Sequence, residues 1–161
     1  MPTVARTRTI PLPARRVWDL ISDPNNLPRW WPETVRVEDV RGKAGAERCR
    51  FTQVMQTKSG KPVRADYRCT AARSGELVVW EQEIEGTPFE GFLRRAELEL
   101  RLSEDDADAA TTVTAEGRRR LRGLSRLGAP LMRRATGRTL TGALDGIERA
   151  LVPARNEGGV P

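Results

Sequence analysis

The segment from residue 125 to residue 151 constrains the fold most, because its side chains repeat with the period of one long helix. Apolar or small side chains recur at steps of three and four and would form one stripe: Met132, Thr136, Leu140, Ala143, Ile147 and Leu151. Pro130 suits a first helical turn, and Val152-Pro153 ends the helix. At about 1.5 Å per residue the helix is roughly 35–40 Å long, enough to cross a small domain. Its apolar stripe therefore requires a broad apolar surface to pack against.

The middle of the chain supplies that surface as a series of predicted strands. The clearest of them, residues 92–102, alternates charged side chains with Ala96, Leu98, Leu100 and Leu102. This is the pattern of an antiparallel strand with one solvated face. Weaker alternation predicts strands at residues 3–10, 34–40, 47–57, 63–71, 77–85 and 110–119.

Two short helices separate the first strand from the rest. One covers residues 14–21, and the other runs from Asp23-Pro24 to Trp30-Trp31, because aspartate is a good N-cap and proline a good first helical residue. The element order predicts an α+β fold in which a curved antiparallel sheet of about seven strands meets one long C-terminal helix. Such a sheet can touch the helix at its ends and leave space in the middle.

The length and composition fit one domain. A chain of 161 residues with 38% hydrophobic residues can bury one sizeable core, which we expect residues 1–152 to form, with a disordered Pro/Gly-rich tail at 153–161. No stretch approaches the ~18 apolar residues of a membrane span and no apolar leader opens the chain, so we expect a cytoplasmic protein. Cys49 and Cys69 are then small buried hydrophobes, and the sequence leaves open whether they lie close together.

Histidine is absent from the sequence, which removes the commonest general base and metal ligand. Neither phosphate-binding pattern, GxxxxGKS/T or GxGxxG, occurs. We therefore predict no metal and no cofactor. Any chemistry must use carboxylates, tyrosine, lysine, arginine or water.

The formal net charge of +6 permits binding to nucleic acid or to an anionic membrane but demonstrates neither. Arginines cluster between Gly117 and Gly123, which we interpret as a surface turn, with contact to an anion or a lipid headgroup as the sharper alternative. We expect no specific nucleic-acid binding, because the basic residues lack interleaved aromatic side chains and no helix-turn-helix pattern frames them.

The N-terminal helix pair resembles a known superfamily. Its residues are Pro13-Ala14-Arg15-Arg16-Val17-Trp18-Asp19-Leu20-Ile21-Ser22-Asp23-Pro24, followed by Leu27-Pro28-Arg29-Trp30-Trp31. They resemble the entry of the START-like superfamily called SRPBCC, in which a first strand is followed by a helix pair with a VW dipeptide, an aspartate and a later tryptophan. The element order is also similar, including a closing helix that begins around Ala129-Pro130. Within the superfamily the chain most resembles the subgroup labelled polyketide cyclase/dehydrase and lipid transport.

The resemblance implies a helix-grip fold with an apolar cavity between the sheet and the long helix. The family has no invariant catalytic motif that could be matched to residues of this sequence. The catalytic residues are therefore unknown, and Tyr67 and Arg94 are only candidates. As an enzyme, the protein would resemble a polyketide aromatase or cyclase, in which a tyrosine or a carboxylate moves protons and an arginine stabilises an enolate.

Side chains on the inward parity of the predicted strands define a candidate ligand site. Trp31 would lie at its mouth, and the helix would contribute Met132, Thr136 and Leu140. Several polar groups on one concave face indicate a filled cavity, because a buried amide or guanidinium needs partners. The strand residues are Phe51, Gln53, Tyr67, Trp80, Gln82, Phe92 and Arg94. The alternative is that some of them reach solvent near strand ends or that a bulge reverses the parity, above all at Arg94.

The favoured function is binding of a small hydrophobic or polycyclic molecule, polyketide-like or lipid, with catalysis of its cyclisation or dehydration left open. A non-enzymatic carrier of lipids or metabolites is one alternative. A basic module for anionic membranes or nucleic acid, docked through the basic C-terminal surface, is another. The sequence permits a monomer or a homodimer.

Overall fold

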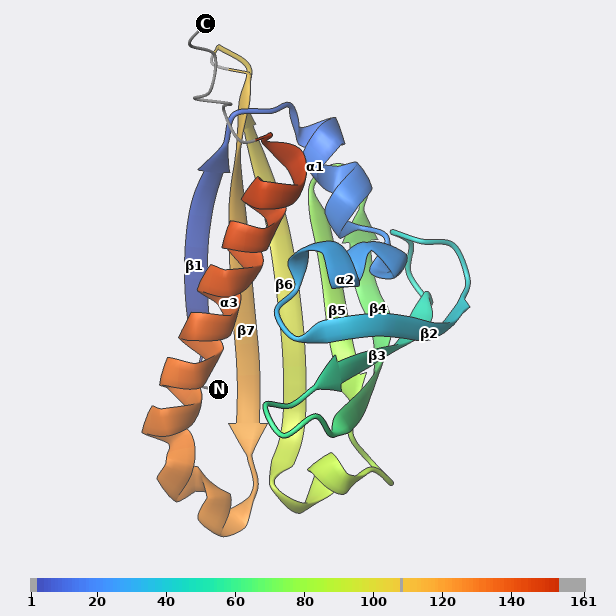
Figure 1. Ribbon diagram of the computed structural model, residues 1–161, viewed down its shortest axis with the longest axis vertical. Coiled ribbons are helices and arrows are strands. Elements are labelled where there is room, and N and C mark those ends of the chain that lie inside the picture. The colour runs from blue at the N-terminus through green and yellow to red at the C-terminus, as the bar shows by residue number, and fades with distance from the viewer. Residues whose placement is uncertain (1–2, 108, 154–161) are drawn as a thin grey trace, which may run out of the picture.

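The structure is a computed structural model that describes residues 3–107 and 109–153. Figure 1 shows its strands, short helices and long closing helix. The elements, with 3₁₀ helices labelled η, are β1 (Thr3–Ile10), α1 (Ala14–Ile21), η1 (Pro24–Asn26), α2 (Leu27–Trp30), β2 (Thr34–Arg41), β3 (Arg50–Gln56), β4 (Pro62–Arg73), β5 (Leu77–Glu83), η2 (Pro88–Gly91), β6 (Leu93–Asp105), β7 (Ala110–Leu121), η3 (Gly123–Gly128) and α3 (Ala129–Leu151).

The strands form one seven-stranded sheet in the order β1-β7-β6-β5-β4-β3-β2. From β2 to β7 each strand pairs antiparallel with the next, and β1 pairs antiparallel with β7. The sheet curves around α3, which lies against β1 and β7 with α1 and α2 beside it (Figure 1). The predicted α+β helix-grip fold is confirmed.

The connection between α1 and α2 follows the predicted capping chemistry. Asp23 accepts a hydrogen bond from the backbone amide of Asn25 at 3.0 Å, and Pro24 occupies the first position of η1. A buried Pro24 and a buried Leu27 then turn the chain back over the sheet. This bend places Trp30 and Trp31 beside α3.

The helix α3 buries one stripe, as its periodicity predicts. Thr136, Leu140, Ala143 and Ile147 are buried, and Leu144 joins them from the next row. Met132 and Leu151, at the two ends of the predicted stripe, are only partly buried. The α-helix begins at Ala129 rather than near residue 125, because the preceding residues form η3.

Ion pairs fix α3 against the edge strand β1. The guanidinium of Arg8 contacts the carboxylate of Asp145 at 2.6 Å and that of Glu148 at 2.6 Å. These carboxylates are about half exposed, so the pairs contribute modestly to stability, on the order of 1 kcal/mol together. These ion pairs also help to orient α3, whose apolar stripe packs on the sheet.

A β-bulge interrupts β6 near its start. Leu93 pairs with Leu121 and Arg95 with Arg120, so β6 advances by two residues where β7 advances by one. The extra residue is Arg94. The bulge turns Leu93 inward and leaves Phe92 and Arg94 exposed.

The end of the chain is described only in part. The helix α3 ends at Leu151, close to the predicted domain boundary at residue 152. Except for Pro153, the tail predicted to be disordered lies outside the described residues. No helix within residues 3–107 and 109–153 is long and apolar enough to cross a bilayer.

Candidate functional site

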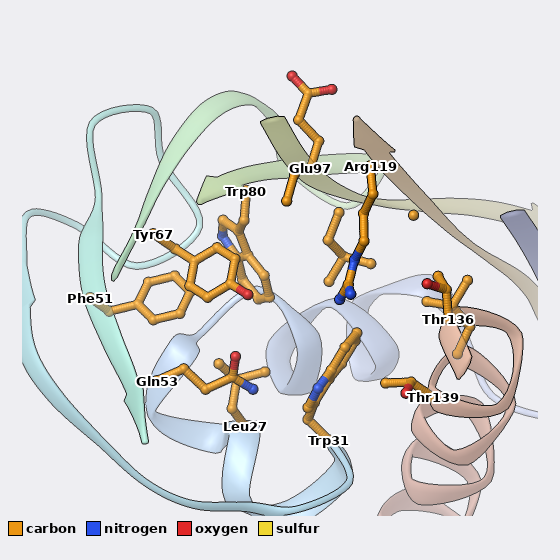
Figure 2. A pocket seen from close by; sticks show the side chains of 14 residues that line it. Leu27, Trp31, Phe51, Gln53, Tyr67, Trp80, Glu97, Arg119, Thr136 and Thr139 are labelled. Carbon is orange, nitrogen blue, oxygen red and sulfur yellow. The ribbon is translucent and has the colours of Figure 1, made fainter. Parts of the chain in front are cut away.

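A narrow cavity lies between the concave face of the sheet and the helices α2 and α3. Its volume is about 40 Å³ for the centre of a water-sized sphere, room for roughly three water molecules. Every strand from β3 to β7 contributes to its wall (Figure 2). The lining residues are Leu27, Trp31, Phe51, Gln53, Tyr67, Trp80, Ala96, Glu97, Leu98, Gly117, Arg119, Thr136, Thr139 and Leu140.

Three aromatic side chains from neighbouring strands form one wall. Phe51 on β3 pairs with Tyr67 on β4 in the sheet, and their rings stack with centroids 5.4 Å apart. The ring of Phe51 also meets the indole of Trp80 on β5 edge-on, at 5.2 Å. Offset stacking and edge-to-face contact are the favoured geometries of aromatic pairs, so this wall is preformed.

Arg119 supplies the one guanidinium among the lining residues. Figure 2 shows its side chain descending from β7 into the cavity above Trp31. Within the described residues no carboxylate lies within 4.0 Å of it, and its only hydrogen bond there is a 3.6 Å contact from Nη1 to the Sδ of Met132. A positive charge that lies among aromatic side chains and has only a weak hydrogen-bond partner can bind an anion.

The phenol of Tyr67 is the second polar group directed at the cavity (Figure 2). Burial raises the pKa of Tyr67, and the positive charge of Arg119 opposes that rise. The hydroxyl is therefore protonated at neutral pH and can donate a hydrogen bond.

The remaining polar groups on the wall are an amide and two hydroxyls. The side-chain amide of Gln53 donates to the hydroxyl of Thr34 at 2.7 Å, so part of its hydrogen-bonding capacity is already used. Thr136 and Thr139 project from α3 on the side of the cavity near Arg119 (Figure 2). Their hydroxyls can donate to or accept from a guest.

The alternation of β7 explains why Arg119 faces inward. Val113, Ala115, Gly117 and Leu121 share its parity and are buried. The intervening Arg118 lies on the outer face, where it contacts the carboxylates of Glu97, Glu99 and Glu116 at 3.2–3.4 Å. The predicted surface turn from Gly117 is therefore wrong, because the strand continues to Leu121.

Many of the sequence-predicted site residues line the cavity. They are Trp31, Phe51, Gln53, Tyr67, Trp80, Thr136 and Leu140. Their positions support the inward parity assigned to β3, β4 and the first part of β5, and the inward stripe of α3.

The other predicted residues lie outside the lining. Phe92 and Arg94 are displaced by the bulge in β6, the alternative that the sequence left open. Gln82 lies beside Tyr67 in the ladder and is buried, but its Nε2 has no hydrogen-bond partner in the described part of the chain and does not reach the cavity. Met132 packs partly buried against a smaller cluster and lines a neighbouring crevice instead.

Several lining residues were not predicted. Ala96 and Leu98 belong to a strand face that the sequence identifies as apolar, so their parity could have placed them. Arg119 shares parity with Val113 and Ala115, a signal hidden by reading Gly117 as a turn. The carboxylate of Glu97 points away from the cavity (Figure 2) and pairs with Arg95 at 2.6 Å. No comparable sequence pattern identifies the other lining residues, which are Leu27, Gly117 and Thr139.

Metal ligands do not gather in this site. Among the described residues, no group of three or more histidine, cysteine, aspartate or glutamate side chains is arranged to hold an ion. The cavity offers hydrogen bonds, one positive charge and aromatic surface.

Comparison with solved structures supports the fold. The protein TTHA0849 from Thermus thermophilus is 23% identical, with a TM-score of 0.73, and the match covers 96% of this chain and 99% of that one. The di-domain ARO/CYC BexL from the BE-7585A biosynthetic pathway is 20% identical, with a TM-score of 0.72, over 92% of this chain and 45% of BexL. A START superfamily protein from Mycobacterium smegmatis is 12% identical, with a TM-score of 0.72, over 92% and 96% of the two chains. At these identities the likeness concerns the fold.

The family comparison is more specific. None of the curated proteins matches this chain. The model of the family described as polyketide cyclase / dehydrase and lipid transport matches residues 1–152, from before β1 to the end of α3. The chain therefore belongs to the polyketide cyclase / dehydrase and lipid transport family.

Proposed function

We propose that this protein binds a small, largely apolar molecule of polyketide or lipid type in the cavity and holds an acidic oxygen of that molecule against Arg119. The observation that carries the proposal is a guanidinium without a carboxylate partner in the described residues, set among aromatic side chains. A carboxylate, enolate or phenolate would pair with it in a poorly solvated space, where charge-assisted hydrogen bonds are strong.

The shape of the cavity favours a flat guest. The aromatic wall of Phe51, Tyr67 and Trp80 offers planar faces, and Trp31 lies across the space from Tyr67 and beneath Arg119 (Figure 2). The present volume of about 40 Å³ is far below the ~300–1,000 Å³ of typical ligand sites. Binding therefore includes an outward displacement of the side of the cavity opposite the aromatic wall, where the side chains of Trp31 and Arg119 are only half-buried.

Catalysis is the second candidate function, and the position of Tyr67 favours it. In a dehydration, water would remove the α-proton, and the guanidinium of Arg119 would stabilise the resulting enolate. The protonated phenol of Tyr67 would then donate its proton to the departing hydroxyl, which leaves as water while the double bond forms, and the phenolate would regain a proton from solvent. Family membership and the ARO/CYC neighbours are consistent with a cyclisation or dehydration of a poly-carbonyl chain. Holding such a chain folded would itself lower the barrier. Conversion of a bound poly-carbonyl compound that stops in Tyr67→Phe, while binding persists, would separate an enzyme from a carrier.

The binding proposal can be tested with two fluorescent probes of similar size, an anionic naphthalene sulfonate and a neutral dye such as Nile red. Arg119→Met removes the charge and keeps an apolar side chain of similar length. We expect this variant to bind the anionic probe roughly tenfold more weakly and the neutral dye nearly as well as the parent. Arg94→Met is the matched control, because Arg94 is exposed and lies outside the cavity lining.

Two results would contradict the proposal. One is equal affinity of the parent and Arg119→Met for the anionic probe. The other is equal loss in Arg119→Met and Arg94→Met, which would mean that the probe senses only overall charge.

A further inference from the structure

One end of the molecule carries a concentration of exposed apolar side chains that the cavity does not use. Leu124, Leu127 and Leu131 are 86%, 82% and 72% exposed, and Phe92 is 38% exposed. We call these residues the apolar tip. They lie together because the amide of Arg122 donates to the carbonyl of Phe92 at 2.9 Å, joining the segments that carry η2 and η3 at the lower end of Figure 1. Of the large hydrophobic side chains exposed among the described residues, only Val35 lies outside this group.

The three leucines share one side of a helical segment. They are spaced by three and then four residues across η3 and the first turn of α3, which aligns them in 3₁₀ and α-helical geometry. Single exposed leucines are common on protein surfaces, whereas a row of protruding ones marks a contact surface. None of them belongs to either core cluster.

Arginines flank the leucines of the apolar tip in the sequence. From Gly117 to Leu144 the sequence contains eight arginines and no aspartate or glutamate. Those exposed are Arg120, Arg122, Arg126, Arg133, Arg134 and Arg138, and within the described part of the chain none has a carboxylate within 4.0 Å. The nearby acidic residues are Glu85 and Glu90 beside η2, where Glu90 accepts from the amide of Gly86 at 3.2 Å. The segment that carries the three leucines is therefore both apolar and cationic.

This combination fits an anionic lipid bilayer. Leucine side chains enter the boundary between headgroups and acyl chains, and arginines bind the phosphates around them. A bilayer accepts protruding side chains without a matching groove, and side chains more than 70% exposed protrude. Nucleic acid would use the arginines but would leave the leucines in water, since base stacking needs aromatic or guanidinium planes.

We propose that η3 and the first turn of α3 dock the protein on an anionic membrane, with Leu124, Leu127 and Leu131 inserted and Arg122, Arg126 and Arg133 on the phosphates. A crevice lined by Ala129, Met132 and Arg133 leads inward from this surface and shares Gly117, Arg119 and Thr136 with the cavity. Docking would therefore bring a route to the cavity against the bilayer. The membrane contact goes beyond the proposed cavity function and does not depend on what the cavity binds.

Co-sedimentation of the full chain with lipid vesicles tests the proposal. We expect binding to phosphatidylcholine vesicles containing roughly 30% phosphatidylglycerol, and at least tenfold weaker binding to pure phosphatidylcholine. The triple variant Leu124→Ser/Leu127→Ser/Leu131→Ser should lose at least tenfold in affinity for the anionic vesicles. Val35→Ser, at the exposed apolar residue away from the tip, is the control and should bind like the parent.

A second pair of variants distinguishes the effect of the arginines near the apolar tip from the effect of the protein's net charge. Arg122→Gln/Arg126→Gln/Arg133→Gln should lose at least tenfold, given about fivefold per interfacial arginine. Arg15→Gln/Arg16→Gln/Arg29→Gln removes the same charge from exposed positions on α1 and α2 and should lose much less. Thermal melts that match the parent establish that each variant is folded. Arg119→Met should sediment like the parent, which separates this proposal from the cavity function.

Five outcomes would overturn the proposal. Four of them are absence of binding to anionic vesicles, unchanged binding in the leucine triple variant, equal losses in the two arginine triple variants, and a parent protein that forms dimers through the leucines and does not bind vesicles. The last result would assign the apolar tip to a second copy of the chain. Tight binding of single-stranded nucleic acid that displaces the vesicles and survives the leucine substitutions would assign the surface to nucleic acid.

Discussion

Cys49 and Cys69 lie opposite each other where the loop before β3 meets β4. The amide of Cys69 donates to the carbonyl of Cys49 at 2.8 Å, and the amide of Arg48 donates to the carbonyl of Cys69 at 3.1 Å. Both thiols are free and buried, with 1% and 4% of their residue surface exposed. Burial raises the pKa of Cys49, and burial raises that of Cys69 to about 11. Buried protonated thiols of this kind are poor nucleophiles.

We predict that neither cysteine of the native protein is alkylated by iodoacetamide at about pH 8 on the timescale on which the unfolded chain reacts fully. Because the folded pKa of Cys69 is raised, its contribution to stability is complete below the ordinary thiol pKa of 9.0 and is lost as the pH rises toward about 11. The free energy of unfolding should therefore fall over this pH range, and it should fall less in Cys69→Ala. Equal alkylation rates for the native and unfolded states, measured by mass spectrometry, would contradict this.

The arginine that enters the cavity could not be identified from the sequence alone. Parity alone assigns Arg94 to the inner face, and one extra residue in β6 moves it into solvent. Such bulges depend on the pairing with the partner strand, here Leu93 with Leu121, which a single strand does not encode locally. Arg119 takes the inward position, because β7 continues past Gly117 without a break.

The stripe of α3 was predictable because a long helix repeats its pattern several times. Because the pattern repeats, the buried positions of α3 can be distinguished from the exposed positions beside them. Leu140→Asp would bury a carboxylate without a partner, and we expect it to lower the free energy of unfolding by about 4 kcal/mol. Thr141→Asp places the same charge on an exposed position of α3 and should change stability by less than about 0.5 kcal/mol. Thermal or urea melts of the pair measure the difference, and similar melts would mean that α3 is not docked through this stripe.

The helices α2 and α3 approach each other at Gly146. A Cβ added there would fall on the backbone carbonyl of Trp30, so only glycine fits this contact. Gly146→Ala should force the helices apart and cost about 2 kcal/mol or more, although alanine favours a helix intrinsically. Gly128→Ala, at the N-cap of α3 with no neighbour within 4 Å of the added carbon, should be close to neutral. Equal unfolding midpoints for the two variants in urea would contradict the tight contact.

The element order could be read from the sequence to a large extent. Alternation in residues 92–102 and the caps at Asp23-Pro24 each have a local physical cause, and the structure confirms them as β6 and η1. The ends of the helices and strands were harder to predict. Gly117 suggests a turn locally, yet in β7 it lies under α3, where an added Cβ would stand 2.9 Å from the Cγ2 of Thr136. Close packing from another element, rather than a change of direction, explains this glycine.

At the scale of the whole molecule, the sheet has two chemically different faces. The outer face carries ion pairs such as Arg64 with Glu38 and Arg68 with Glu81, which are partly exposed and keep that face in water. The inner face carries the aromatic wall and Arg119. This division follows from alternation and was predictable, whereas the cavity volume was not. The volume depends on how the side chains of Trp31 and Arg119 lie, and these orientations arise only after the sheet, α2 and α3 have assembled.

The pairing of β1 with β7 also determines when the protein can finish folding. Ile10 pairs with Thr111, so the two strands meet only after a loop of roughly 100 residues has closed, a slow step with a high entropic cost. On a ribosome that adds about 5–20 residues per second, β1 waits roughly 5–20 s for its partner strand. Until then β1 has no neighbour in the sheet, and α3, which rests on both strands, has no complete surface. Before β7 emerges, β2 to β6 are the strands whose partners adjoin them in the sequence, so pairing of the sheet can begin with this meander.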